Sequence, residues 1–83
     1  MAHTVERIQT GVRLEKRLVK VLKGLAEYND MTMGDLLEGI LLHAFEGKCA
    51  FQEESLGVVA DLKRLYKLDL TASDSHQLKE VSE

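Results

Sequence analysis

The sequence predicts a mostly α-helical domain with one N-terminal strand, two helices and a third, C-terminal helix. Three patterns indicate this fold class. Residues 7–14 alternate between apolar and polar side chains, which is typical of a strand with one buried face. Residues 14–26 and 33–45 each carry an apolar stripe at helical spacing. A single strand is not stable alone, so we expect it to pair with the same strand of a second copy.

The predicted strand separates two sets of side chains. Its even positions are apolar or β-branched, and they comprise Ile8, Thr10, Val12 and Leu14. Its odd positions are polar or lack a side chain, and they comprise Arg7, Gln9, Gly11 and Arg13. The pattern predicts that the even positions face a core and that the odd positions face outward.

The first predicted helix follows from Glu15. Leucines recur at positions 14, 18, 22 and 25, three or four residues apart. Lys16, Lys20 and Lys23 share another side of this helix. Gly24 weakens a helix by about 1 kcal/mol relative to Ala, which favours a close packing contact at that point. The sequence from Tyr28 to Asp30 predicts its end.

The second predicted helix begins after Thr32, a good N-cap, with Asp35 three residues later. Its apolar stripe is wide and belongs in a core; it comprises Met33, Leu36, Leu37, Ile40, Leu41, Ala44 and Phe45. Gly47 is a typical residue for the end of a helix.

A third helix is expected after Ser55, with an apolar side formed by Leu56, Val59, Leu62 and Tyr66. From Asp69 the chain is mostly polar, which predicts a mobile tail. The predicted organisation is therefore a flexible arm (1–6), a dimerisation and DNA-binding domain (7–47), a helical extension (48–68) and a mobile polar tail (69–83).

Length and composition favour a dimer. A chain of 83 residues buries only about 60% of its unfolded surface, and Cys49 is the only cysteine, so no disulfide within the chain can help. We therefore expect an obligate homodimer. No long apolar run and no secretory signal are present, which predicts a cytoplasmic protein.

The net charge of -3 hides a division along the chain. Residues 7–23 hold six basic side chains against Glu15, whereas residues 24–46 hold five acidic side chains and no basic one. The basic half is suited to facing a polyanion. The alternative explanation is that the basic and the acidic residues form two ordinary solvent-exposed faces.

The alternating segment 9–14, the Leu18/Leu22/Leu25 stripe and the turn into Thr32 together resemble the ribbon-helix-helix family of Arc- and MetJ-type repressors. The resemblance covers about residues 7–47. It implies an intertwined dimer whose paired antiparallel strands enter the DNA major groove. The dimer core would then comprise Ile8, Val12, Leu14, Leu18, Leu22, Leu36, Ile40, Leu41 and Phe45.

The resemblance assigns base contacts to Gln9, Gly11 and Arg13. Arg can bond guanine and Gln can bond adenine through two atoms each, so both suit sequence recognition. Gly11 departs from the family pattern, because a side chain usually occupies this middle position. The alternative is that Gln9 and Arg13 simply lie on the solvent-facing side of the strand.

Phosphate contacts are expected from Arg7, Lys16, Arg17, Thr32, Met33 and Gly34. Free backbone N–H groups after Thr32 suit a phosphate, although Asp35 competes for them and a plain N-cap is the alternative. For Lys20 and Lys23, a solvent-exposed face of the helix is the usual explanation.

These features predict a sequence-specific DNA-binding homodimer, a transcriptional repressor or autoregulator that binds double-stranded DNA. One alternative is an antitoxin-like protein whose residues 51–70 bind a protein partner. Another is a degenerate ribbon-helix-helix that only dimerises. No spacing typical of a catalytic triad on a rigid scaffold, a cofactor loop or a metal site is present, so we expect no enzyme, cofactor or metal.

Overall fold

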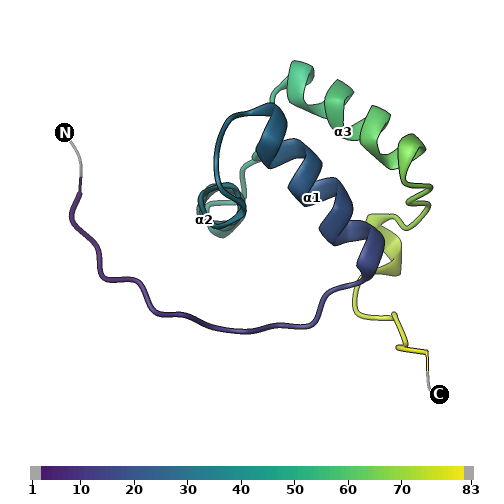
Figure 1. The fold of residues 1–83 in the computed structure, drawn as a ribbon, viewed down its shortest axis with the longest axis horizontal. Coiled ribbons are helices and arrows are strands. Elements are labelled where there is room, and N and C mark those ends of the chain that lie inside the picture. The colour runs from purple at the N-terminus through teal and green to yellow at the C-terminus, as the bar shows by residue number, and fades with distance from the viewer. Residues whose placement is uncertain (1–2, 82–83) are drawn as a thin grey trace.

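The chain folds into three α-helices of equal length, α1 (Lys16–Tyr28), α2 (Met33–Phe45) and α3 (Glu53–Leu65), followed by a short 3-10 turn, η1 (Ala72–Asp74). The computed structural model describes residues 3–81. Figure 1 shows α1 and α3 side by side, with α2 seen nearly end-on and therefore crossing α1 steeply. Within the described residues, no helix is both long and apolar enough to cross a membrane.

The predicted ribbon-helix-helix fold class is wrong, because the structure has no β-strand anywhere in residues 3–81. Residues 7–14 are extended, as Figure 1 shows, but their backbone groups bond to no other backbone group of this part of the chain. The physical reason is the one that makes isolated strands unstable. Extended backbone becomes a strand only when a second segment accepts and donates its ladder of hydrogen bonds, and this chain folds its other segments into helices.

Helices α1 and α3 pack tightly and run antiparallel. A β-carbon placed on Gly24 of α1 would lie 2.9 Å from Leu62 Cδ2 of α3, so the glycine lets the two helices approach closely. Further toward the start of α1, Lys20 lies over the Tyr66 ring. The close contact predicted at Gly24 is therefore confirmed, and α3 supplies it.

The core lies where all three helices meet. Leu25, Ala26 and Leu36 are its buried members, and half-buried side chains pack against them from α1, α2, α3 and the α2–α3 connection. These surrounding side chains are Leu22, Ile40, Phe51, Val58, Val59 and Leu62. Val59 and Leu62 of the predicted apolar side of α3 are thus used inside the chain, whereas Leu56 is exposed.

Only part of the predicted dimer core is covered within the single chain. Leu36 is buried, and Leu18, Leu22 and Ile40 are half-buried. The others are exposed, and they comprise Ile8, Val12, Leu14, Leu41 and Phe45. The single chain buries the stripe of α1 and one edge of the stripe of α2, because a helix packs against its neighbours along one side only.

The helix ends follow local chemistry. Asp30 and Gly47 adopt left-handed backbone conformations just after α1 and α2, with φ of 54° and 70°. At the second of these ends, the Lys48 N–H donates to the His43 carbonyl, which closes a Schellman motif. The predicted N-cap Thr32 accepts a hydrogen bond from the Asp35 N–H at 3.1 Å. Helix α3 begins earlier than predicted, at Glu53, and Ser55 lies within it.

The C-terminal segment lies against the helices. Leu68 is buried, and Leu70 and Leu78 line an apolar hollow of about 360 Å³ between α1 and α3. Thr71 and Asp74 form a capping box around η1. Residues 1–2 of the predicted arm and residues 82–83 of the predicted tail lie outside the described residues. The proposed division of the chain at residue 47 stays a prediction.

Candidate nucleic-acid interface

The start of α1 combines a cap with a cluster of charges. The Glu15 carboxylate accepts hydrogen bonds from the backbone N–H groups of Arg17 and Leu18, at 2.8 and 3.0 Å, and so serves as the N-cap. Desolvation opposes the ionised form of Glu15, but these bonds and the Arg17 guanidinium outweigh it and lower the pKa of Glu15. The N–H groups that suit an anion are therefore already occupied by a carboxylate.

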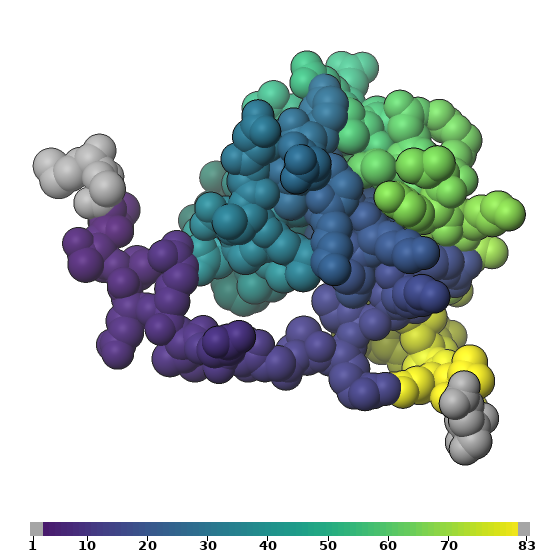
Figure 2. All heavy atoms as spheres, in the orientation of Figure 1, coloured from purple at the N-terminus to yellow at the C-terminus, as the bar shows by residue number. Residues whose placement is uncertain are grey.

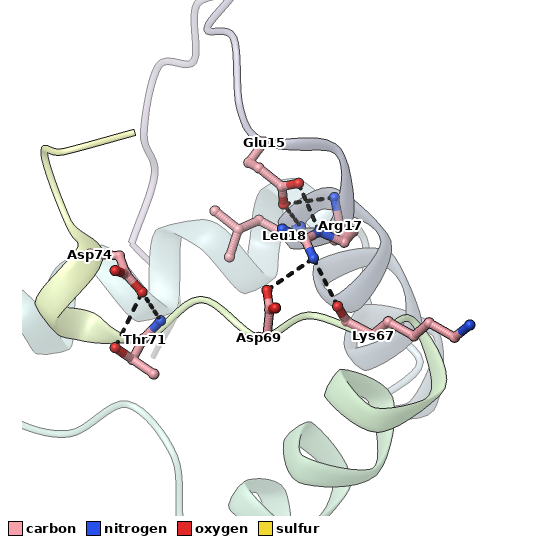
Figure 3. A network of polar contacts seen from close by, with 7 residues as sticks. All are labelled: Glu15, Arg17, Leu18, Lys67, Asp69, Thr71 and Asp74. Carbon is pink, nitrogen blue, oxygen red and sulfur yellow. Dashed lines mark hydrogen bonds and ion pairs between the residues drawn. The ribbon is translucent and has the colours of Figure 1, made fainter. Parts of the chain in front are cut away.

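Arg17 connects the start of α1 to the C-terminal segment, as Figure 3 shows. Its guanidinium pairs with Glu15 at 3.0 Å and also donates to the Lys67 carbonyl oxygen at 2.9 Å and to Asp69 at 3.0 Å. The hydrogen bond to Glu15, with the neighbouring carboxylates, raises the pKa of Arg17. Arg17 is half-buried and bonded to three partners, so its predicted contact with DNA phosphate would require these bonds to open.

Three lysines form an exposed row on α1. We call Lys16, Lys20 and Lys23 the lysine row; their spacing of four and three residues places them on one face of the helix, and all three are exposed. Within residues 3–81 none of the three forms an ion pair. The Lys20 ammonium lies 5.7 Å from the centre of the Tyr66 ring, which orients it by a cation–π contact. The row therefore presents uncompensated positive charge.

The predicted base-contacting residues lie in the extended segment that precedes α1. Gln9, Gly11 and Arg13 are all exposed, and a β-carbon at Gly11 would meet no atom within 4 Å. The Arg13 guanidinium makes a two-atom contact with the Glu80 carboxylate, in which Nε donates to Oε1 at 3.1 Å and Nη2 donates to Oε2. Arg13 thus lies in the segment that leads into α1, and it has an acidic partner in Glu80.

Arg7 is held on α2. Its guanidinium donates two hydrogen bonds to Glu38, at 2.8 and 2.9 Å. The hydrogen bond raises the pKa of Arg7 and lowers that of Glu38, because each charge favours the other. Arg7 is therefore paired with a residue of α2, and its predicted phosphate contact stays a prediction.

The start of α2 is the other predicted phosphate site. The Thr32 hydroxyl is used as a cap, and the Asp35 carboxylate lies in the first turn beside Met33 and Gly34. A negative charge in the first turn of a helix repels phosphate. The geometry here is that of an ordinary N-cap, and the predicted contacts of Thr32, Met33 and Gly34 with phosphate stay predictions.

Residues 3–81 contain no candidate metal site, because no three His, Cys, Asp or Glu side chains lie close enough together to hold a metal ion. Comparisons with protein-family models, with curated proteins and with solved structures found no match to this chain.

Three acidic partners of residues 7–23 were not predicted from the sequence, and they are Glu38, Asp69 and Glu80. Asp69 and Glu80 lie 52 and 67 positions away from the arginines that they contact. Their charge is visible in the sequence, but contacts over such separations depend on where the C-terminal segment is placed by Leu68.

Proposed function

We propose that the protein is a DNA-binding homodimer that acts as a transcriptional repressor or autoregulator. The observation that carries the proposal is the lysine row. A basic surface on an acidic protein is not needed for solubility, and exposed lysines at helical spacing suit the phosphates of double-stranded DNA. Arg13 and Gln9, in the adjoining exposed segment, are residue types that can contact base edges.

A second copy is part of the proposal, because the single chain leaves an unusually large total surface exposed to solvent. Its accessible surface is 7553 Å², against about 5,000 Å² for a compact monomer of this mass. Its radius of gyration is 14.2 Å, against about 12 Å for a compact chain of this length. Figure 2 shows the extended segment standing out from the helical body. Stable interfaces bury about 1,200–2,000 Å² in total, so the excess is sufficient for one.

The uncovered side chains belong to two regions. Ile8 and Val12 of the extended segment are 84% and 74% exposed, and Phe45 at the end of α2 is 79% exposed. Leu41 and Leu42 extend the α2 surface. Arg7 joins the two regions through Glu38. A second copy that covers α2 would leave the lysine row of each chain free for DNA, because the row lies on α1.

The alternative in which residues 51–70 capture a protein partner has less support. Phe51, Val59 and Leu62 pack against the core of their own chain, which leaves Leu56 and Leu65 as the large apolar side chains that this segment exposes. A dimer that binds no DNA remains the other outcome of the tests below.

DNA binding can be tested with matched lysine variants. We expect Lys16→Gln/Lys23→Gln to weaken binding to random-sequence duplex DNA strongly, and to reduce the slope of log affinity against log salt by about 0.9 for each DNA phosphate that is no longer neutralised. The control, Lys48→Gln/Lys63→Gln, removes the same charge elsewhere and should change both quantities much less. Fluorescence anisotropy at several salt concentrations measures them. Equal losses in both variants, or no binding by the parent at low salt, would contradict the proposal.

Self-association is tested separately by sedimentation. Leu41→Glu should convert a dimer to a folded monomer, because Leu41 is half exposed in the single chain and is not needed for its core. Leu65→Glu, which places the same charge at an exposed leucine of α3, should leave the dimer intact. A parent protein that sediments as a monomer would refute this part of the proposal.

A further inference from the structure

The C-terminal segment lies against the basic end of α1, on which it makes contacts that DNA would also need. Figure 2 shows the C-terminal atoms, in yellow, beside the beginning of α1, in dark blue. Leu68 is 7% exposed and anchors the segment, and Arg17 holds it through the Lys67 carbonyl and the Asp69 carboxylate. The segment is therefore positioned by the fold and not only by its charge.

Beyond this anchor, the segment reaches Arg13. Glu80 accepts hydrogen bonds from Nε and Nη2 of Arg13, the pair of nitrogens on one edge of the guanidinium. A phosphate or a guanine edge that binds an arginine through two atoms needs such an edge. Glu80 and DNA thus compete for the same atoms when they approach that edge.

The charge of the segment supports this competition. Residues 69–81 contain the carboxylates of Asp69, Asp74 and Glu80 against one ammonium group, Lys79, which gives a net charge of -2 with histidine neutral. The Arg13 and Glu80 side chains are 83% and 66% exposed. An ion pair so exposed is weak and opens readily, which suits a contact that lowers affinity without abolishing it.

We propose that residues 69–80 form an intramolecular competitor, in which Glu80 on Arg13 and Asp69 on Arg17 reduce the affinity of the basic surface for DNA. This inference rests on the proposed DNA-binding function and adds its regulation. Release of the segment would free Arg13 and would leave Arg17 paired with Glu15 alone, so the positive charge at the start of α1 would be less neutralised.

The test is a double-mutant cycle in the full chain, with short random-sequence duplex DNA as the probe. Glu80→Gln should tighten binding about two- to fivefold at low salt, as expected for an exposed ion pair. The control is Glu53→Gln, which removes the same charge from an exposed position of α3 that pairs with no cation within residues 3–81. It should leave the affinity close to that of the parent.

The second arm repeats Glu80→Gln in an Arg13→Gln background, where the gain should disappear. Equal gains in DNA affinity from Glu80→Gln and Glu53→Gln, or a gain in affinity that persists without Arg13, would overturn the proposal that the segment is a competitor. A parent that binds DNA no less tightly than Glu80→Gln would refute the competitor alone. If neither the parent nor any variant binds DNA, the proposed function fails, and the competitor fails with it. Nitrogen NMR of the Arg13 side chain, which should shift in Glu80→Gln, reports the ion pair independently of DNA.

Discussion

The contact between Gly24 and Leu62 gives the sharpest test of the fold, because it exists only if α3 packs on α1. In an exposed helix, Gly24→Ala would stabilise the protein by about 1 kcal/mol through helix propensity. In this structure the new β-carbon would lie 2.9 Å from Leu62 Cδ2 and 3.3 Å from Leu62 Cδ1. Forcing extra volume into a packed contact costs about 1–3 kcal/mol. We therefore expect Gly24→Ala to lower the free energy of unfolding by about 0–2 kcal/mol, the difference of the two effects.

The matched background is Leu62→Val, because valine has no δ-carbons and so removes both close atoms. In that background Gly24→Ala should become stabilising, by about 1 kcal/mol, as the propensity gain is no longer opposed. Urea denaturation followed by circular dichroism measures all four proteins, at one protein concentration so that any self-association affects them equally. A stabilisation by Gly24→Ala in the parent that equals the one in Leu62→Val would refute the packing of α3 on α1.

Two further predictions concern the helix starts. Thr32→Ala should lower the free energy of unfolding by about 0.5–2 kcal/mol, because it removes the hydrogen bond that the Asp35 N–H donates to the Thr32 hydroxyl. Thr32→Ser keeps a hydroxyl and should retain most of that stability in the same urea titration. An equal loss of stability in both variants would show that the hydroxyl cap contributes nothing. The pKa values of Glu15 and Glu38 lie below the ordinary value of 4.5, so both carboxylates contribute stability above that pH and lose it as the pH falls through their folded-state pKa values. Thermal melts between neutral pH and pH 3 should therefore show a fall in stability that is shallower in Glu15→Gln/Glu38→Gln, and parallel curves for the two proteins would contradict the assignment.

The strand shows where a local pattern is insufficient. The alternation of residues 7–14 is real, and these residues are extended in the structure. Alternation, however, describes only which side chains share a face, whereas a strand is defined by hydrogen bonds to a second segment. The side chains predicted to face a core, such as Ile8 and Val12, are instead exposed in the single chain.

The candidate site was predicted in part. The lysine row is visible in the sequence, because helical spacing alone places residues four and three apart on one face. The partners of the arginines are not visible. Arg7, Arg13 and Arg17 each contact a carboxylate from a distant segment, namely Glu38, Glu80 and Asp69. Opposite charges are common in any sequence, so charge by itself selects no pair.

The sequence by itself determined the elements that depend on nearby residues: the helices after Glu15 and Thr32, their ends at Asp30 and Gly47, and the need for a close contact at Gly24. Caps, turns and periodicity act over a few positions, so they are encoded locally. Only the tertiary structure decided that Leu62 of α3 fills the contact at Gly24, that residues 7–14 stay unpaired, and that Glu80 reaches Arg13. These choices depend on which apolar faces cover one another in three dimensions, and several arrangements of the same amphipathic helices satisfy the same local pattern.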